Sequence, residues 1–233
     1  MNNVFSNTRN IIQPTLTLDG IEIDKKQKMD GMKLLGKLPS NSIPLVFFDP
    51  QYRGILDKQT YGNEGVGRQK QRANLPQMNT KIIKLFLRQI ERVLLPSGHL
   101  MLWADKFIVC SEIQLLTKGL SLQLVDMITW DKGRIGMGYR TRRKSEYLII
   151  FQKPPTRAKG VWLIHNIPDV WTEKIENGNR NHTHSKPIEL QKILIKAVTN
   201  KGDIVLDPSA GGYSVMVAAL STERHFIGCD LIG

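Results

Sequence analysis

The stretch DIVLDPSAGGY, residues 203–213, begins with a short apolar run and ends in a turn that contains two glycines. Residues 203–206 are typical of a buried strand, and residues 214–220, which follow the turn, are typical of a helix. A strand that runs through such a turn into a helix lets a ligand approach the backbone closely. The stretch has neither the Gly-Lys-Ser/Thr of a phosphate-binding loop nor the glycine spacing of a dinucleotide fingerprint. It predicts an α/β fold with a ligand site at the end of this strand.

A second strand, residues 226–229, follows the predicted helix and ends in Asp230. An acidic residue at the end of this strand is well placed to bind ribose hydroxyls. Together the two stretches indicate an adenosine-containing cofactor, and the alternative is that Asp230 only caps the last strand.

The same alternation of strand and helix patterns continues toward the start of the chain. Apolar runs predict further strands at residues 43–48, 99–103, 122–130 and 147–151, and helical spacing predicts helices at residues 80–95 and 188–198. This order predicts an α/β fold with a mostly parallel, doubly wound sheet. We expect one domain over residues 1–233, interrupted by irregular segments at residues 53–79, 131–144 and 154–186.

The charge of the chain points to a polyanionic partner. Lys and Arg number 33 against 21 Asp and Glu, which gives a formal charge of +12 over 233 residues. Such an excess favours nucleic acid first and an anionic membrane surface second. Basic residues concentrate in two of the irregular segments, at Arg68, Lys70 and Arg72 and at Arg134, Arg140, Arg142, Arg143 and Lys144.

Other features of the composition exclude several classes of protein. Two cysteines, Cys110 and Cys229, can form neither a disulfide framework nor a four-ligand zinc site of their own, and we expect no metal. The first residues lack the pattern of a signal peptide, and no apolar run approaches the ~18 residues that span a bilayer. We expect a cytoplasmic protein that does not enter the membrane.

The second chemical motif is FFDPQY, residues 47–52, at the end of the first predicted strand. Ligands of open α/β sheets bind outside the carboxyl ends of the strands, so Asp49 and Tyr52 should lie at the rim of a cleft. The Asp49 carboxylate and the Pro50 carbonyl are two acceptors, and Tyr52 adds an aromatic face. This set suits a planar base that carries an amino group.

Six motifs in this order make the sequence similar to one known family. DPQY at residues 49–52 resembles Asp-Pro-Pro-Tyr, and residues 207–213 resemble Asp-Pro-Phe-x-Gly-x-Gly. HTHSKP at residues 182–187 resembles His-Pro-Thr-Gln-Lys-Pro, and residues 30–39, 92–98 and 146–153 fit the remaining segments. Over residues 22–233 the chain resembles the S-adenosylmethionine-dependent DNA amino-methyltransferases of the permuted β class. In that class the catalytic motif precedes the cofactor motif.

The resemblance implies a circularly permuted, Rossmann-like methyltransferase fold. It also implies transfer of a methyl group from S-adenosylmethionine to N6 of a flipped-out adenine in double-stranded DNA, at a specific or relaxed target sequence. The catalytic residues would be Asp49, Pro50 and Tyr52. The cofactor-binding residues would be Asp30, His182, Ser185, Lys186, Asp207, Pro208, Ser209, Gly211, Tyr213 and Asp230. Nucleic acid would be bound by Arg68, Lys70, Arg72, Arg134, Tyr139, Arg140, Arg142, Arg143 and Lys144.

The target-recognition segment of the family corresponds to residues 154–186, with residues 53–79 as a second candidate. A segment this short predicts a short or relaxed target sequence. The resemblance further suggests a homodimer and a cognate restriction endonuclease as partners, and the sequence decides neither.

Three positions depart from the family pattern. Gln51 replaces the second proline, but the contact expected there is the Pro50 carbonyl, which is kept. Ser209 replaces the Phe that packs on the cofactor, and Tyr213 replaces the last glycine and could supply the missing aromatic surface. Three alternatives stay open: methylation of cytosine N4, methylation of adenine in RNA, and a nucleic-acid-binding module without catalysis. Aspartate at position 49 favours adenine.

Overall fold

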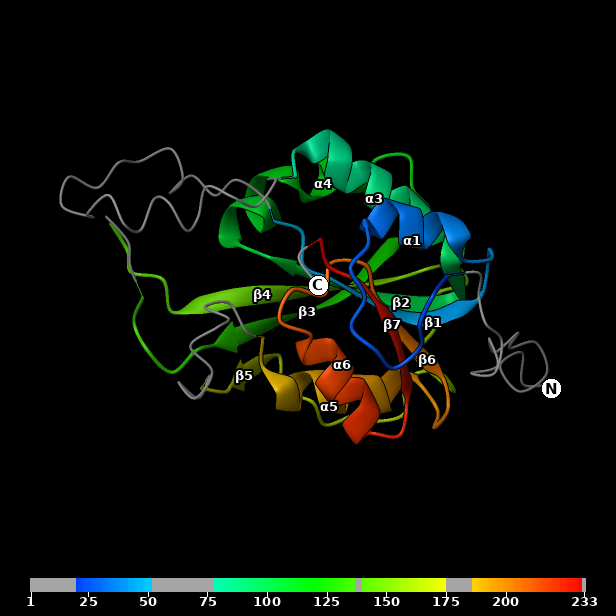
Figure 1. Ribbon diagram of the computed structural model, residues 1–233. Helices are drawn as coiled ribbons and strands as arrows, with labels where there is room; N and C mark the ends of the chain where they lie inside the picture. Colours follow the sequence, from blue (N-terminus) through cyan, green and yellow to red (C-terminus); the bar gives the residue numbers. More distant parts are fainter. Residues whose placement is uncertain (1–19, 52–77, 137–139, 175–185, 232–233) are drawn as a thin grey trace.

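The computed structural model describes residues 20–51, 78–136, 140–174 and 186–231 (Figure 1). Seven strands form one sheet: β1 (Ile43–Phe48), β2 (Leu94–Ala104), β3 (Gln123–Asp131), β4 (Ser145–Gln152), β5 (Val170–Thr172), β6 (Ile204–Asp207) and β7 (His225–Gly228). The helices are α1 (Gly31–Lys37), α3 (Thr80–Val93), the π-helix η2 (Ile108–Glu112), α4 (Ile113–Thr117), α5 (Ile188–Val198) and α6 (Ser214–Ser221).

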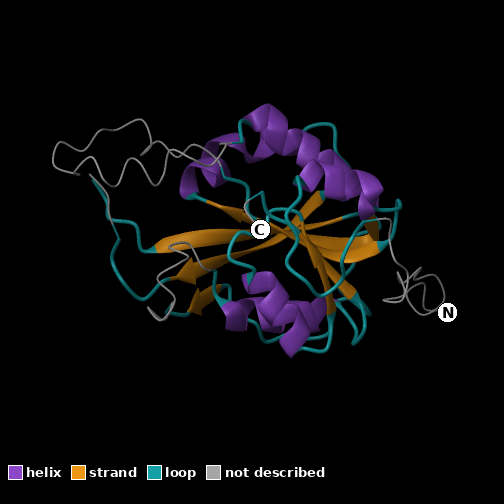
Figure 2. Ribbon diagram, in the orientation of Figure 1, coloured by secondary structure: helices purple, strands orange, loops and turns teal. Residues whose placement is uncertain are grey.

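The sheet is mostly parallel, as the sequence predicts. Its strand order is β5-β3-β4-β2-β1-β6-β7, and only β4 runs antiparallel to both of its neighbours. Helices α1, α3 and α4 cover one face, and α5 and α6 cover the other (Figures 1 and 2). The predicted doubly wound α/β architecture is therefore confirmed.

The inner strand β1 is apolar along its whole length because helices cover both of its faces. All six residues are buried, and from Leu45 to Phe48 the side chains alternate between the two cores. Val46 and Phe48 belong to the core under α1 and α3, where Phe48 stacks on Phe86 with ring centroids 5.1 Å apart. Leu45 and Phe47 belong to the core under α5 and α6. This period of two is what a strand buried on both faces requires.

Two predicted boundaries shift where α3 passes into β2. The helix ends at Val93 and the strand starts at Leu94, so the residues predicted to separate the two elements lie inside the strand. Ser97 takes a left-handed φ of 59°, and the pairing of β1 with β2 skips residues between Leu94 and His99. The break predicted at residues 96–98 is therefore an irregularity within a strand.

Residues 20–30, called here the N-terminal strap, run beside β7 and lead into α1. The Asp24 amide donates to the Phe226 carbonyl at 2.8 Å. The Asp24 carboxylate accepts from the Phe226 amide at 2.7 Å and lies 2.7 Å from Nδ1 of His225. At the end of the strap, a bridge joins Lys28 to Asp230. These contacts fix where α1 begins, at the carboxyl end of β7.

Within the described ranges, no helix is long and apolar enough to cross a membrane.

The start of α1 packs directly on the turn that follows β6. A Cβ atom built on Gly31 would collide with the Pro208 carbonyl oxygen and lie 2.8 Å from the Phe86 ring. We predict that Gly31→Ala lowers the free energy of unfolding by about 1–3 kcal/mol, because backbone and core must move to admit the methyl group. Denaturant unfolding followed by circular dichroism measures this change.

Gly36 in the same helix provides the matched control, because a Cβ there meets nothing within 4 Å. Gly36→Ala should raise the free energy of unfolding by up to about 1 kcal/mol through helix propensity. Equal effects of the two substitutions would contradict the close approach of α1 to the Pro208 turn.

Candidate functional site

The two chemical motifs meet because β1 and β6 are parallel neighbours. Val46 pairs with Leu206, so the residues that follow each strand emerge at the same edge of the sheet. The Ser209 hydroxyl joins them: it accepts from the Asp49 amide at 3.3 Å and donates to the Asp49 carbonyl at 3.3 Å. Residues 49–51, 207–213 and 229–230 are called the rim below. Ser209, which stands where the family has Phe, thus clamps one motif to the other.

Asp207 is the most buried carboxylate of the rim, with only 4% of the residue exposed. Its Oδ1 accepts from the Ser209 amide at 3.0 Å. Burial raises the pKa of Asp207 to about 7, the negative charges of Asp49 and Asp230 add to the increase, and the bonds from Ser209 oppose it. Carboxylates therefore gather at one edge of a protein that is basic as a whole.

The turn after Asp207 has two residues with a left-handed backbone, Gly211 at φ 48° and Tyr213 at φ 58°. Tyr213 adopts this conformation in place of the glycine of the family motif. Its hydroxyl donates to the Gln27 carbonyl at 3.0 Å and accepts from the Gln27 amide at 3.1 Å. Its ring is buried and meets Phe226 edge-on at 6.1 Å. These contacts offset a backbone strain on the order of 1–2 kcal/mol.

The Tyr213 ring is therefore not available as the aromatic surface that the sequence suggested for the cofactor. Only 2% of the residue is exposed, because the side chain fills the core under α6 and holds the N-terminal strap. Through these contacts the Tyr213 side chain supports the other residues of the rim.

Asp30 and Asp230 lie on the two segments that flank the turn. Asp30 caps α1, and its Oδ1 accepts from the amides of Met32 and Lys33 at 2.9 and 3.1 Å. The Asp230 carbonyl accepts from the Met29 amide at 3.1 Å, and the Asp230 amide donates to the Gln27 carbonyl at 3.1 Å. Both carboxylates raise the pKa of the buried Cys229 thiol, which reaches about 12 chiefly through burial. Asp30, Asp207 and Asp230 thus surround one turn.

Lys186 lies between the carboxylates of Asp49 and Glu146. The resemblance assigns it to the cofactor, but its Nζ lies 3.1 Å from Oδ2 of Asp49 and 2.8 Å from Oε2 of Glu146. The ammonium also lies 4.9 Å from the centre of the Trp103 ring. Burial alone would lower the pKa of Lys186, but Asp49 and Glu146 more than compensate and raise it. Lys186 is therefore a buried cation held by two carboxylates.

Sequence analysis missed the role of Glu146 and Lys132 in this group. Lys132 forms an ion pair with Oε1 of Glu146, while Lys186 takes the other oxygen. Burial would raise the pKa of Glu146, but the two lysines hold it at about 2. β4 is antiparallel, so its first polar residues lie at the edge where the parallel strands end, and nothing in the sequence marks this strand as antiparallel.

The basic loop between β3 and β4 is described in part. Arg134, Arg140, Arg142 and Lys144 are exposed, and Arg143 is half-buried. Nζ of Lys144 lies 2.8 Å from Asp131, and Arg143 lies 3.6 Å from Asp105. The loop leaves β3 at its carboxyl end, so it lies at the same edge of the sheet as Asp49. Seven of the predicted site residues lie outside the described residues: Tyr52, Arg68, Lys70, Arg72, Tyr139, His182 and Ser185.

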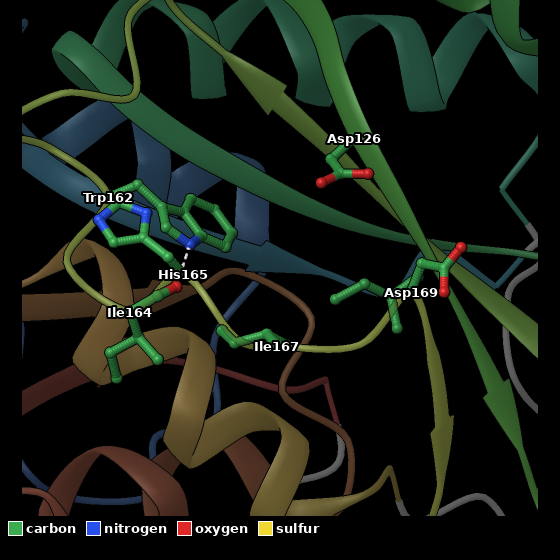
Figure 3. A pocket seen from close by; sticks show the side chains of 7 residues that line it. Asp126, Trp162, Ile164, His165, Ile167 and Asp169 are labelled. Carbon is green, nitrogen blue, oxygen red and sulfur yellow. Dashed lines mark hydrogen bonds between the residues drawn. The ribbon is translucent and has the colours of Figure 1, made fainter.

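A separate pocket of about 150 Å³ lies beside β3, lined by Asp126, Ile128, Trp162, Ile164, His165, Ile167 and Asp169 (Figure 3). The Trp162 indole donates to the Ile164 carbonyl, and the Leu163 amide donates to the Ala197 carbonyl of α5 at 2.7 Å. Asp169 precedes β5, so the pocket lies toward the amino end of that parallel strand. Residues 154–174 of the predicted target-recognition segment therefore pack on the sheet and contribute β5. Among the described residues, no group of three His, Cys, Asp or Glu side chains could hold a metal ion.

Asp207 makes the stability of the ligand-free protein depend on pH. Its folded pKa lies above its unfolded value, so ionisation costs stability as pH rises from about 4 to about 7. We predict that Asp207→Asn, which keeps the shape without the charge, is more stable than the wild type at pH 8 by a few kcal/mol. Urea unfolding of both proteins between pH 4 and pH 8 measures the difference. It should vanish near pH 4, and a difference that is independent of pH would contradict the raised pKa.

Comparison with known proteins gives three findings. A family model described as DNA methylase, covering both N6 and N4 enzymes by its name, matches residues 43–232. The chain is 56% identical over 211 residues to the type II methyltransferase M.HhaII of Haemophilus parahaemolyticus, covering 90% of this chain and 92% of that protein. Two solved structures share the fold. They are the SAM complex of M1.HpyAVI (TM-score 0.64, 17% identity, 88% and 92% covered) and the cytosine-N4-specific PvuII DNA methyltransferase (TM-score 0.65, 17% identity, 89% and 81% covered).

Proposed function

Because this chain belongs to the N6/N4 DNA methylase family, we propose that it methylates N6 of adenine in double-stranded DNA, with S-adenosylmethionine as the methyl donor. The observation that carries this proposal is the Ser209 clamp, which fixes Asp49 and Pro50 beside the turn at residues 207–213. An acceptor pair for an amino group and a candidate donor-binding turn thus share one rim.

Asp49 and Pro50 supply what an amino group needs in order to react. The amino nitrogen of adenine is a poor nucleophile because its lone pair is delocalised into the ring. The Asp49 carboxylate and the Pro50 carbonyl each accept a hydrogen bond from one N–H of the adenine amino group. They thereby direct the lone pair of the nitrogen out of the ring plane. Holding reactants in such an orientation contributes ~7–11 kcal/mol. Acceptors placed where positive charge develops add to this effect.

The rim also suits S-adenosylmethionine, which when bound supplies an electrophilic methyl group on a sulfonium cation. Asp207 already feels the negative charges of Asp49 and Asp230, so the unliganded rim favours a cation. We assign Asp30 and Asp230 to the polar groups of the nucleoside, and Pro208, Ser209 and Gly211 to backbone contacts along the turn. We assign His182 and Ser185 to the binding of S-adenosylmethionine, as the resemblance of their motif implies. Tyr213 acts indirectly, by holding the strap.

DNA would approach the edge of the sheet that carries the basic loop. The exposed Arg134, Arg140 and Arg142 suit phosphates, and binding through them weakens as salt rises because counterions are released. A base inside a duplex has to be flipped out to reach Asp49, at a cost of a few kcal/mol. Tyr52 is assigned to stacking on the flipped base. The segments at 154–186 and 53–79 are assigned to a short or relaxed target sequence.

We propose duplex DNA as the substrate and the cytoplasm as the compartment in which the protein acts. A homodimer and a cognate endonuclease would be additional partners, and neither is needed for the chemistry at Asp49.

We predict that Asp49→Ala reduces methyl transfer by about 10²–10³-fold, on the scale of losing a preorganised electrostatic contact, while the affinity for S-adenosylmethionine stays within a few-fold. Transfer of labelled methyl groups to DNA, followed by nucleoside analysis, gives the rate and identifies the product. Calorimetry gives the affinity. Asp126→Ala is the control, because Asp126 is an exposed carboxylate near the far end of β3.

N6-methyladenine from the wild type and none from Asp49→Ala is the expected result. N4-methylcytosine as the product would contradict adenine as the target base but would remain consistent with Asp49 as the proposed catalytic site. A label that appears in RNA and not in DNA would contradict the proposed nucleic acid. Failure of the wild type both to bind S-adenosylmethionine and to transfer methyl groups would indicate a binding module without catalysis.

A further inference from the structure

We propose that Lys186 is a positioning residue for the Asp49 carboxylate, anchored by Glu146, and not a ligand of the methyl donor. This inference rests on the proposed function, because it explains how the carboxylate at the centre of that function is held. The carrying observation is a chain of alternating charges that runs from Lys132 through Glu146 and Lys186 to Asp49.

The contacts of Lys186 leave little freedom to its ammonium group. Two carboxylate oxygens lie 2.8 and 3.1 Å from Nζ, and the Trp103 ring lies below it. Only 14% of the side chain is exposed. A buried ammonium that is surrounded by two carboxylates and an indole ring has its charge fully compensated. Reaching for a ligand outside this group would cost Glu146 one of its two lysine partners and would cost Asp49 its contact with the ammonium.

Three separate elements build this arrangement, so its geometry depends on the fold and not on one loop. Asp49 follows β1, Glu146 lies near the start of β4, and Lys186 directly precedes Pro187, the residue that caps α5. Lys132, at the start of the basic loop, fixes the second oxygen of Glu146. The base of the loop assigned to DNA and the catalytic carboxylate therefore belong to one ionic network.

The network also has an electrostatic consequence for Asp49. Among the residues that the structure describes, the charged groups near this carboxylate include Lys186 at 3.1 Å and Asp207, which belongs to the same rim. Glu146 lies beyond Lys186 and acts on Asp49 through it. Asp207 disfavours the ionised form of Asp49 when it is itself ionised, whereas the ammonium favours it. With Oδ2 of Asp49 on Lys186, the other carboxylate oxygen can accept the N–H of the base, and the ionised form accepts more strongly than the protonated one. Lys186 therefore extends the pH range in which Asp49 can act.

The experiment replaces Lys186 with Met, which keeps the length without the charge, with Gln as a second neutral variant and with Arg as the conservative one. Lys201→Met is the matched control, because it also removes one positive charge but from an exposed pair with Glu223. Single-turnover methyl transfer is measured from pH 5 to pH 9, and the dissociation constant of S-adenosylmethionine is measured by calorimetry.

We expect Lys186→Met and Lys186→Gln to move the acidic limb of the rate profile upward by about 1–3 pH units, the shift that one close opposite charge produces. At a pH on that limb the rate falls about tenfold per unit, while the dissociation constant stays within about threefold. Lys186→Arg and Lys201→Met should keep the limb at the wild-type position.

A rate profile that stays in place, together with a large loss of affinity for S-adenosylmethionine, would overturn the proposal and return Lys186 to the cofactor. If the wild type transfers no methyl group, only the proposed function is contradicted, and the positioning role of Lys186 is tested by a second measurement that does not need catalysis. Carboxyl-¹³C aspartate labelling, with Asp49→Asn to assign the resonance, gives the titration midpoint of Asp49 without catalysis. A higher midpoint in the Lys186→Met protein supports the positioning role, and an unchanged one contradicts it.

Discussion

The parallel pairing of β1 with β6 is the constraint on which the rest of the site depends. Asp49 and Ser209 are 160 positions apart in the chain, yet the two bonds of the Ser209 hydroxyl to the Asp49 backbone join them at one edge of the sheet. The pairing in turn requires helices on both faces, because β1 is buried throughout. The cores under α3 and α6 therefore set the distance between the proposed acceptor pair and the proposed cofactor turn.

Charge is arranged around this edge in two layers. The rim carries Asp49, Asp207 and Asp230, which suits a cationic methyl donor, whereas the adjoining loop between β3 and β4 is basic and suits DNA. The partly buried ion pairs of Glu146 with Lys132 and Lys186 lie between the two layers. A protein of net charge +12 can thus keep an acidic rim beside a basic loop, because the opposite charges of these pairs compensate one another locally.

Much of the fold was predictable from the sequence, because long apolar runs and helical spacing mark the elements that bury most surface. The strand at residues 43–48, the helix at residues 188–198 and the sheet they imply follow from such patterns. The elements missed, α1, the helices at residues 108–117 and β5, are short. They depend on tertiary contacts, such as the packing of Gly31 on the Pro208 turn. Propensity alone does not specify segments of this kind.

For the site, the motifs named candidate residues but not what each one contacts. Asp49, Pro50 and the turn at residues 207–213 lie together, because strand ends are fixed by topology. The contacts of Lys186 and Tyr213 depend on where β4 and the N-terminal strap come to lie. Neither placement is encoded near those residues in the chain, so a motif-based assignment could not foresee them.

A crystal structure of the protein with S-adenosylmethionine bound would show the methyl donor and the Asp49 carboxylate together. We expect the donor to lie along residues 207–213 between Asp30 and Asp230, with its methyl group toward Asp49, and Lys186 to stay on Asp49 and Glu146. A donor bound away from this turn, or a Lys186 side chain that has left Asp49 to contact the donor, would contradict the proposed site.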